Sequence, residues 1–297
     1  MNNRPLTIAL HGGAGNLARY QGTGRLEEAE SFLSSLIDDL YSMLEGGAAA
    51  LDVVTNACVR MEDSALFHAG RGSSPNTRGY VECDASIMDG RDRSAGAIAA
   101  ARSIRNPIMA ARLVMERTPH VLFVAEEADR LATEHGLQTV ELSYYIPCDT
   151  AAIAGGADAR RSGTVGAVAL DVHGNIAAAT TTGGTLRKTA GRVGDTPIIG
   201  AGTYAQNTVG AVSCTGVGEY FIRAAAAHTI VSRMQLLGET VHAAAGMVMS
   251  EIESLGGNGG IIAIDDRGGV AMPFTTSGMY RAMRTSRGER LVLALRD

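Results

Sequence analysis

The sequence contains no tryptophan, and aromatic residues make up only 4% of its 297 residues. Base and carbohydrate platforms depend on such rings, so neither kind of ligand is expected. Lys and Arg number 26 against 31 Asp and Glu, with no basic block or stripe, which argues against nucleic acid as a main partner. No apolar run reaches about 18 residues, so the sequence predicts no membrane-spanning helix.

Cysteine is also scarce, and Cys58, Cys83, Cys148 and Cys214 lack the spacing of a metal site. Cys58 and Cys214 lie in apolar runs, which is typical of reduced core residues. The N-terminus shows no charged-then-apolar leader, so we expect a cytoplasmic protein. The common Gly-x-Ser-x-Gly elbow, the P-loop and the dinucleotide fingerprint are all missing, so those nucleophile and nucleotide sites are not expected.

Hydrophobic residues make up 45% of the chain, enough for a large core, and 37 glycines indicate many tight turns. A glycine-rich turn is predicted at His11–Gly15, after the first strand. The predicted strands cluster into hairpins, which favours mainly antiparallel sheets covered by helices over a regular βαβ fold. Helices are predicted at 26–44, 48–61, 107–116, 126–135, 219–234 and 239–250, and strands at 6–10, 83–89, 95–101, 120–125, 165–170, 175–181, 209–214, 260–264, 270–274 and 290–295.

Thr164 opens an apolar strand directly after Gly163, behind a small, polar and aperiodic segment at 149–162. We interpret that segment as a linker that ends at a scissile bond. Cleavage between Gly163 and Thr164 would give Thr164 a free α-amine beside its hydroxyl, so that one residue carries nucleophile and base. The alternative is an ordinary threonine in a strand, because β-branched residues favour strands.

Thr182 lies at the far end of the predicted hairpin that begins with Thr164, so it could return beside that residue. Arg192 and Asp195 lie three residues apart in a glycine-flanked loop and could hold the carboxylate and ammonium of an α-amino acid. A surface ion pair is the alternative for these two.

At residues 215–218, a Thr-Gly-Val-Gly turn joins a strand to a helix, and backbone N–H groups there suit an oxyanion. The Thr215 hydroxyl could supply a second donor. His11 follows a strand, and structural packing is as plausible as function there. A structural role is favoured for His68, which lies at an apolar-to-glycine junction.

These segments, in this order, resemble the plant-type L-asparaginase and isoaspartyl peptidase family, a threonine branch of the N-terminal-nucleophile hydrolases. The resemblance covers most of the chain. It is densest from 163 to 223, where Gly-Thr-Val-Gly-Ala-Val, Gly-Arg-Val-Gly-Asp-Thr-Pro and Ser-Cys-Thr-Gly-x-Gly-Glu follow one another.

The resemblance implies an α+β fold, an αββα four-layer sandwich cut into an N-terminal subunit (1–163, with a linker at about 149–163) and a C-terminal subunit (164–297). It implies pairing into an (αβ)2 homo-oligomer and no catalytic cofactor. Thr164 would be the nucleophile, Thr182 its support, and Thr215 with Gly216 the oxyanion hole. Arg192, Asp195, Gly216 and Gly218 would bind substrate. Main-chain carbonyls would hold a structural sodium at Met61, Glu62, Ser64, Phe67, Ala69 and Arg71.

Three features depart from the family pattern. His68 stands where an Asn that orients the nucleophile is usual, and its charge would depend on pH. The linker is shorter than usual, and the loop 185–190 has Ala190 where Pro is common.

The expected reaction is hydrolysis of L-asparagine and β-aspartyl (isoaspartyl) dipeptides through an acyl-threonine. The alternatives are a glycosylasparaginase-like enzyme or threonine protease of the same fold, and an uncleaved homologue that only binds amino acids.

Overall fold

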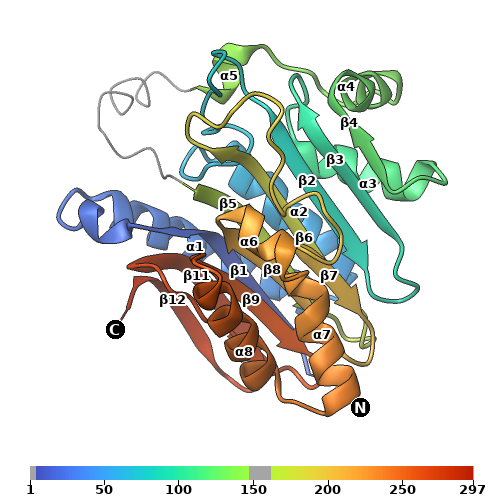
Figure 1. Ribbon diagram of the computed structural model, residues 1–297. Coiled ribbons are helices and arrows are strands. Elements are labelled where there is room, and N and C mark those ends of the chain that lie inside the picture. Colours follow the sequence, from blue (N-terminus) through green and yellow to red (C-terminus); the bar gives the residue numbers. More distant parts are fainter. Residues whose placement is uncertain (1–4, 147–161, 297) are drawn as a thin grey trace.

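The computed structural model describes residues 5–146 and 162–296, a mixed α/β arrangement in which two sheets face each other (Figure 1). In this part of the chain the larger sheet has the order β12-β11-β1-β5-β6-β2-β3-β4 and the smaller β10-β9-β8-β7. The larger sheet consists of β1 (Thr7–Gly15), β2 (Cys83–Asp89), β3 (Ala95–Ala101), β4 (Leu122–Val124), β5 (Ser162–Leu170), β6 (Ile176–Thr185), β11 (Gly278–Thr285) and β12 (Arg290–Leu295). The smaller consists of β7 (Thr203–Gln206), β8 (Gly210–Gly216), β9 (Gly259–Asp265) and β10 (Val270–Ala271).

Helices pack on both outer faces (Figure 1). α1 to α3 contact the larger sheet, whereas α7 and α8 contact the smaller one. The described helices are η1 (Leu17–Tyr20), α1 (Arg25–Glu45), α2 (Ala50–Asp63), α3 (Pro107–Arg117), α4 (Ala125–Glu134), α5 (Leu142–Tyr145), α6 (Gly218–Arg223), α7 (Ala226–Leu237) and α8 (Val241–Ser254).

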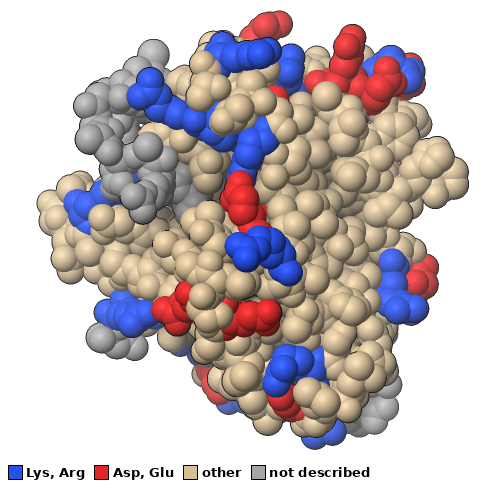
Figure 2. Space-filling model, viewed as in Figure 1, with Lys and Arg blue, Asp and Glu red and all other residues tan. Residues whose placement is uncertain are grey.

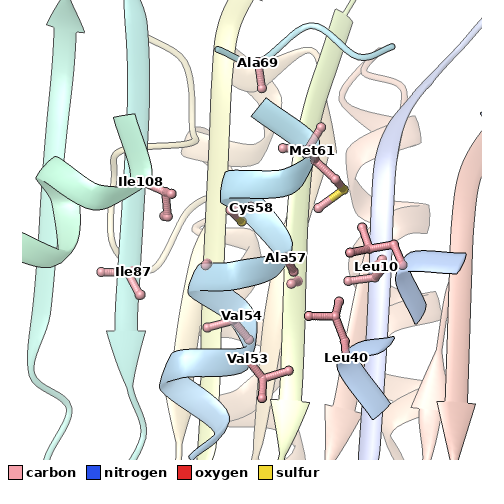
Figure 3. Packing of buried hydrophobic residues seen from close by; sticks show 14 of the residues in the cluster. Leu10, Leu40, Val53, Val54, Ala57, Cys58, Met61, Ala69, Ile87 and Ile108 are labelled. Carbon is pink, nitrogen blue, oxygen red and sulfur yellow. The ribbon is translucent and has the colours of Figure 1, made fainter. Parts of the chain in front are cut away.

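The apolar periodicity of the helices explains this packing. Figure 3 shows Leu40 of α1 and Leu10 of β1 pointing toward Ala57 of α2, and all three are fully buried. A second core fills the space between β5 and β6, the smaller sheet, α7 and α8. The strands β5 and β6 therefore lie between two hydrophobic cores. Burial of this kind stabilises the fold by roughly 25 cal/mol per Å² of apolar surface.

The prediction of mainly antiparallel sheets is confirmed, because every described strand pairing except β3 with β4 is antiparallel. The linker predicted at 149–162 lies outside the described residues except for Ser162, which belongs to β5. Cys58, Cys83 and Cys214 are buried and unbridged. Within the described ranges, no helix combines the length and apolarity needed to cross a bilayer.

Two boundary predictions are wrong. The glycine-rich segment 11–15 is not a turn, because β1 continues through it with an irregularity between His11 and Ala14, where Gly13 adopts φ +105°. The helix predicted at 219–234 is two helices, because Ala225 adopts φ 45° and ends the run between α6 and α7. The first difference carries His11 into the sheet, next to the candidate nucleophile.

Candidate active site

Thr164 and Thr182 lie opposite each other on the paired strands β5 and β6. The Thr164 hydroxyl donates to Thr182 Oγ1 at 3.3 Å, and both residues are buried. The expectation that the hairpin returns Thr182 beside Thr164 is therefore met in the geometry.

Thr182 also contacts the peptide bond that precedes Thr164. Its hydroxyl donates to the carbonyl oxygen of Gly163 at 3.3 Å and accepts from Gly184 N–H at 3.0 Å. A donor on a carbonyl oxygen draws electron density from the carbon and favours attack there. Thr182 thus links the hydroxyl of Thr164 to the carbonyl of Gly163.

His11 holds the other side of Thr164. Burial lowers the pKa of His11 to about 3, so the ring is neutral. Its Nδ1 lies 3.0 Å from the Thr164 carbonyl oxygen and its Nε2 lies 2.9 Å from Ser213 Oγ. A neutral ring donates from one nitrogen only, so we assign the proton to Nδ1 and the acceptor role to Nε2. His11 therefore fixes the peptide plane of Thr164, a contact that the sequence alone left undecided.

A chain of buried hydroxyls continues from His11 between the two sheets. Ser213 Oγ lies 2.7 Å from Thr180 Oγ1, which lies 2.5 Å from Thr203 Oγ1. Ser86 Oγ lies 2.8 Å from Thr203 Oγ1. This network joins strands of both sheets near Thr164 without any charge, which makes the support of this candidate nucleophile rigid and insensitive to pH.

Thr215 and Gly216 end β8 and face the same region. Ala14 N–H donates to Thr215 Oγ1 at 3.4 Å, so the smaller sheet contacts β1 at this point. A Cβ placed on Gly13 would lie 3.0 Å from Gly163 Cα, so β1 in turn touches the peptide bond before Thr164. Gly216 adopts φ +156°, and a side chain there would collide with Asn258 O at 2.5 Å. Thr215 and Gly163 therefore both border β1, at the neighbouring residues Ala14 and Gly13.

Arg192 and Asp195 are brought near each other, but they are not equivalent. The Arg192 guanidinium makes two hydrogen bonds of 2.8 Å to Glu219. The sequence did not single out Glu219 as a partner of Arg192. Figure 2 shows basic and acidic side chains lying beside one another on the face viewed, rather than a field of one sign.

Asp195 is buried, and its Oδ2 has no hydrogen-bond partner among the described residues. Burial raises the pKa of Asp195 to about 7. A Cβ on Gly218 would lie 2.7 Å from Asp195 Oδ1, so only glycine allows the backbone of α6 to approach this carboxyl group. An unpaired buried carboxylate is costly, and a bound ammonium would compensate it.

The loop that precedes Arg192 is anchored by buried charges that sequence reasoning missed. Lys188 Nζ donates to the carbonyl oxygen of Glu82 at 3.0 Å and lies 3.8 Å from Asp84 Oδ2. Asp84 Oδ1 accepts from Ala100 N–H, and the Glu82 carboxylate accepts from Gly191 N–H. Asp84 pairs in register with Thr182, so this anchor connects the loop before Arg192 to β6, the strand next to that of Thr164.

His68 borders Gly163, the residue that precedes Thr164. A Cβ on Gly163 would lie 2.6 Å from His68 Cβ, and the His68 carbonyl accepts from Gly183 N–H at 2.8 Å. Its Nδ1 lies 3.3 Å from Ser74 Oγ. His68 is therefore next to the candidate cleavage site, and its role in orienting Thr164 stays a prediction.

The loop predicted to hold sodium turns tightly after α2. A Cβ on Gly72 would lie 2.2 Å from the Phe67 carbonyl oxygen and 3.3 Å from that of Ala65, so carbonyl groups converge there. The Glu62 carbonyl accepts from Arg71 N–H, and the Met61 carbonyl accepts from the Ser64 hydroxyl. Each carbonyl keeps a second lone pair. The described residues contain no cluster of His, Cys, Asp or Glu suited to a metal ion, so main-chain oxygens would be the ligands.

Between two facing sheets, the hydroxyls of Thr164 and Thr182 are hydrogen-bonded to each other, and that of Thr182 also donates to the Gly163 carbonyl, an arrangement that suits a hydrolase. The chain belongs to the asparaginase family, whose model matches residues 4–152 and 147–293.

Named relatives agree with this assignment. The isoaspartyl peptidase of Escherichia coli (strain K12) is 45% identical over 293 residues, which cover 93% of this chain and 91% of that protein. The isoaspartyl peptidase of Salmonella typhimurium is 46% identical, with 93% and 94% covered. The isoaspartyl peptidase/L-asparaginase of Rattus norvegicus is 40% identical over 286 residues, with 92% and 84% covered.

Proposed function

We propose that this chain is an isoaspartyl peptidase and L-asparaginase that first cuts its own Gly163–Thr164 bond. The observation that carries the proposal is the contact sequence from Thr164 Oγ1 to Thr182 Oγ1 to the Gly163 carbonyl oxygen. The hydroxyls of Thr164 and Thr182 and the carbonyl of Gly163 lie in one buried cluster, which supports the roles of nucleophile, supporting hydroxyl and attacked carbonyl. The membership of the asparaginase family and the names of the relatives support the same activity.

Self-cleavage proceeds by attack of Thr164 Oγ1 on the Gly163 carbonyl carbon. The C–N bond then breaks, the Thr164 amine takes a proton, and an ester joins Gly163 to the Thr164 hydroxyl. Water hydrolyses this ester to a Gly163 carboxylate and a free Thr164. The new α-amine has a reference pKa of about 7.7–8.0, so it can act as a base near neutral pH.

In hydrolysis, Thr164 Oγ1 attacks the β-carbonyl of the substrate while its amine accepts the hydroxyl proton. Thr215 and the Gly216 N–H stabilise the oxyanion, each donor contributing about 3–4 kcal/mol. The carboxylate of the substrate binds Arg192, and its ammonium binds Asp195 and the Gly218 carbonyl. Ammonia or an amino acid leaves with the proton, and water then releases aspartate from the acyl-threonine.

The finer assembly is part of the proposal. We infer an αββα four-layer sandwich, supported by helices that contact the outer faces of the two sheets. The subunits 1–163 and 164–297 stay together after the cut, because β1 pairs with β5 and β11 and β2 pairs with β6. Two such units form an (αβ)2 assembly, and the unbridged thiols suit the reducing cytoplasm.

A structural sodium belongs to the same proposal. The main-chain carbonyls of Met61, Glu62, Ser64, Phe67, Ala69 and Arg71 would hold it, and unwound backbone carbonyls are suitable Na⁺ ligands. The ion would fix the loop that carries His68. It takes no part in the chemical steps.

A denaturing gel and an ammonia-release assay test the proposal together. The purified chain should give two bands of roughly 17 and 14 kDa, as expected for fragments of about 160 and 130 residues. N-terminal sequencing of the smaller band should begin at Thr164. Thr164→Ala should stay at full length and release no ammonia, whereas Thr133→Ala on the exposed face of α4 should behave like the natural chain. A cut or active Thr164→Ala protein would contradict the proposal.

The substrate class is tested by comparing L-asparagine, an isoaspartyl dipeptide and a glycosylated asparagine. Activity on the first two supports the proposal. Activity on the glycosylated compound alone would favour the glycosylasparaginase-like alternative, and an uncut chain that binds aspartate without turnover would favour a binding protein.

A further inference from the structure

A small cavity lies next to the candidate cleavage site. It has a volume of about 30 Å³, and its lining includes Gly163 and His68 as well as Arg25 and Tyr280. A cavity needs roughly 10–15 Å³ of this kind of volume to hold one water molecule, so this one has room for a small polar group. Glycines 12, 13 and 15 of β1 form much of its wall.

The cavity borders Gly163, and a series of contacts connects it with the proposed head-group residues. Asp195 touches Gly218 at the start of α6, and Gly216 and Thr215 precede this point on β8. Thr215 contacts Ala14 of β1, and the neighbouring Gly13 touches Gly163, which lines the cavity. These contacts connect the proposed head-group residues, through the oxyanion donors and β1, to Gly163 and the cavity.

The polar side chains that line the cavity include basic groups and hydrogen-bond donors. None of the described residues that line it is Asp or Glu. The Arg25 guanidinium lies over the Tyr20 ring, 4.6 Å from the ring centre, and no carboxylate of the described residues pairs with it. A stacked guanidinium keeps its fork of N–H donors available for a carboxylate.

Tyr280 supplies a second donor. Its side chain is 6% exposed, and its hydroxyl has no hydrogen-bond partner among the described residues. The ring packs edge-on against Phe67, with centroids 5.8 Å apart, so its position is fixed. Burial raises the pKa of Tyr280 to about 12, and although Arg25 lies close enough to lower that pKa, no hydrogen bond of normal geometry joins the two. A buried hydroxyl without a partner is a group that a ligand would satisfy.

We propose that Arg25 and Tyr280 bind the terminal carboxylate of the leaving residue of an isoaspartyl dipeptide. This inference rests on the proposed function, because it names the subsite for the group that departs from the acyl-threonine. L-Asparagine releases only ammonia and does not reach this subsite. A dipeptide with a free terminal carboxylate gains a charge-assisted contact that its C-terminal amide lacks.

The test measures kcat/KM for β-aspartyl-leucine, for its C-terminal amide and for L-asparagine. Arg25→Met should lower the ratio of kcat/KM for the free-acid dipeptide to that for the amide about tenfold, the range expected for a hydrogen bond to a charged group. Tyr280→Phe should lower the same ratio about threefold without lowering the melting temperature, because it removes only an unpartnered hydroxyl. Arg60→Met, which removes a cation that pairs with Asp39 on the exposed side of α2, is the matched control and should leave the ratio unchanged.

Unchanged ratios in both variants would overturn the proposal. An equal loss of kcat/KM with all three substrates would also overturn the proposal. The carboxylate that cleavage forms on Gly163 would then be the group that Arg25 and Tyr280 bind. A natural chain that is cut but hydrolyses no dipeptide would refute the proposed function instead, and this proposal with it, before any variant is compared.

Discussion

The candidate nucleophile and the loop proposed to bind the substrate head group are held in place by opposite means. Thr164 is fixed by strand pairing and by neutral groups, namely Thr182, His11 and the hydroxyls behind it. The loop at 185–195 is fixed by buried charges, with Lys188 next to Asp84 and Glu82, and Asp195 without a partner. Neutral pairing gives a geometry that pH does not disturb, whereas buried charge leaves a site that a charged ligand completes.

The largest effect should come from breaking the neutral side. Thr182→Val keeps the β-branched shape but removes the hydroxyl that donates to the Gly163 carbonyl. Self-cleavage should slow about 10³-fold, the upper cost of losing one such donor. The half-life of the full-length band on a denaturing gel measures this.

Thr182→Ser is the matched control, because it keeps the hydroxyl and should still be cut. If Thr182→Val were cut as fast as the natural chain, the contact with Gly163 would have no part in cleavage.

Removing a buried charge from the loop at 185–195 should lower the free energy of unfolding more than it lowers the rate of the reaction. Lys188→Met leaves Asp84 buried without its cation, and a broken buried pair costs about 3–5 kcal/mol. Urea unfolding of a Thr164→Ala background, which keeps the chain intact, measures the free energy of unfolding. Adding Asp84→Asn should recover part of the loss, because it removes the stranded charge. Additive losses in the double variant would show that the two residues do not interact.

The sequence predicted the neutral side well and the charged side poorly, for a physical reason. Thr164 and Thr182 stand at the two ends of one hairpin, so a local pattern was enough to bring them together. Lys188 lies in a loop, where a lysine is normally exposed. Only its long-range contacts with Glu82 and Asp84, about a hundred positions earlier, make it a buried anchor.

The fold shows the same limit. The strand β11 was missed because Arg281 and Arg284 interrupt its apolar residues. In the structure Arg281 lies over the Phe274 ring and Arg284 over the Tyr41 ring, so both cations are accommodated by distant aromatics. The break at Ala225 was missed because a run of alanines carries no stop signal.

Asp195 should make substrate binding depend on pH. Its pKa is about 7 in the free protein, so it is protonated at pH 6 and cannot pair with a substrate ammonium. We expect kcat/KM for L-asparagine to fall about tenfold per pH unit below pH 7. Asp195→Asn should lower kcat/KM at pH 8 by about tenfold to thirtyfold and flatten this limb, because a lost hydrogen bond to a charged group costs about 1.5–3 kcal/mol.

Asp195 should also make the free energy of unfolding depend on pH, but this quantity should fall with rising pH, whereas kcat/KM rises. Between the unfolded pKa near 4 and the folded pKa near 7, the folded chain keeps a proton that the unfolded chain has lost. The free energy of unfolding of the natural chain should therefore fall as pH rises through this window. That of the Asp195→Asn variant should fall less. Glu62, whose pKa burial raises to about 8, acts in the same direction in both proteins and cancels in the comparison. Equal pH slopes in urea unfolding would contradict the assignment.

The smallest effect should come from an ion pair at the edge of the same loop. Glu219→Gln weakens the contact with Arg192, but the Glu219 side chain is 54% exposed, against 0% for Asp84. Exposed pairs contribute about 0–1 kcal/mol, because water already solvates both charges. Urea midpoints should therefore differ from the natural chain far less than those of Lys188→Met. If Glu219→Gln and Lys188→Met lowered stability equally, burial would not explain why the Lys188–Asp84 pair should matter more than the Arg192–Glu219 pair.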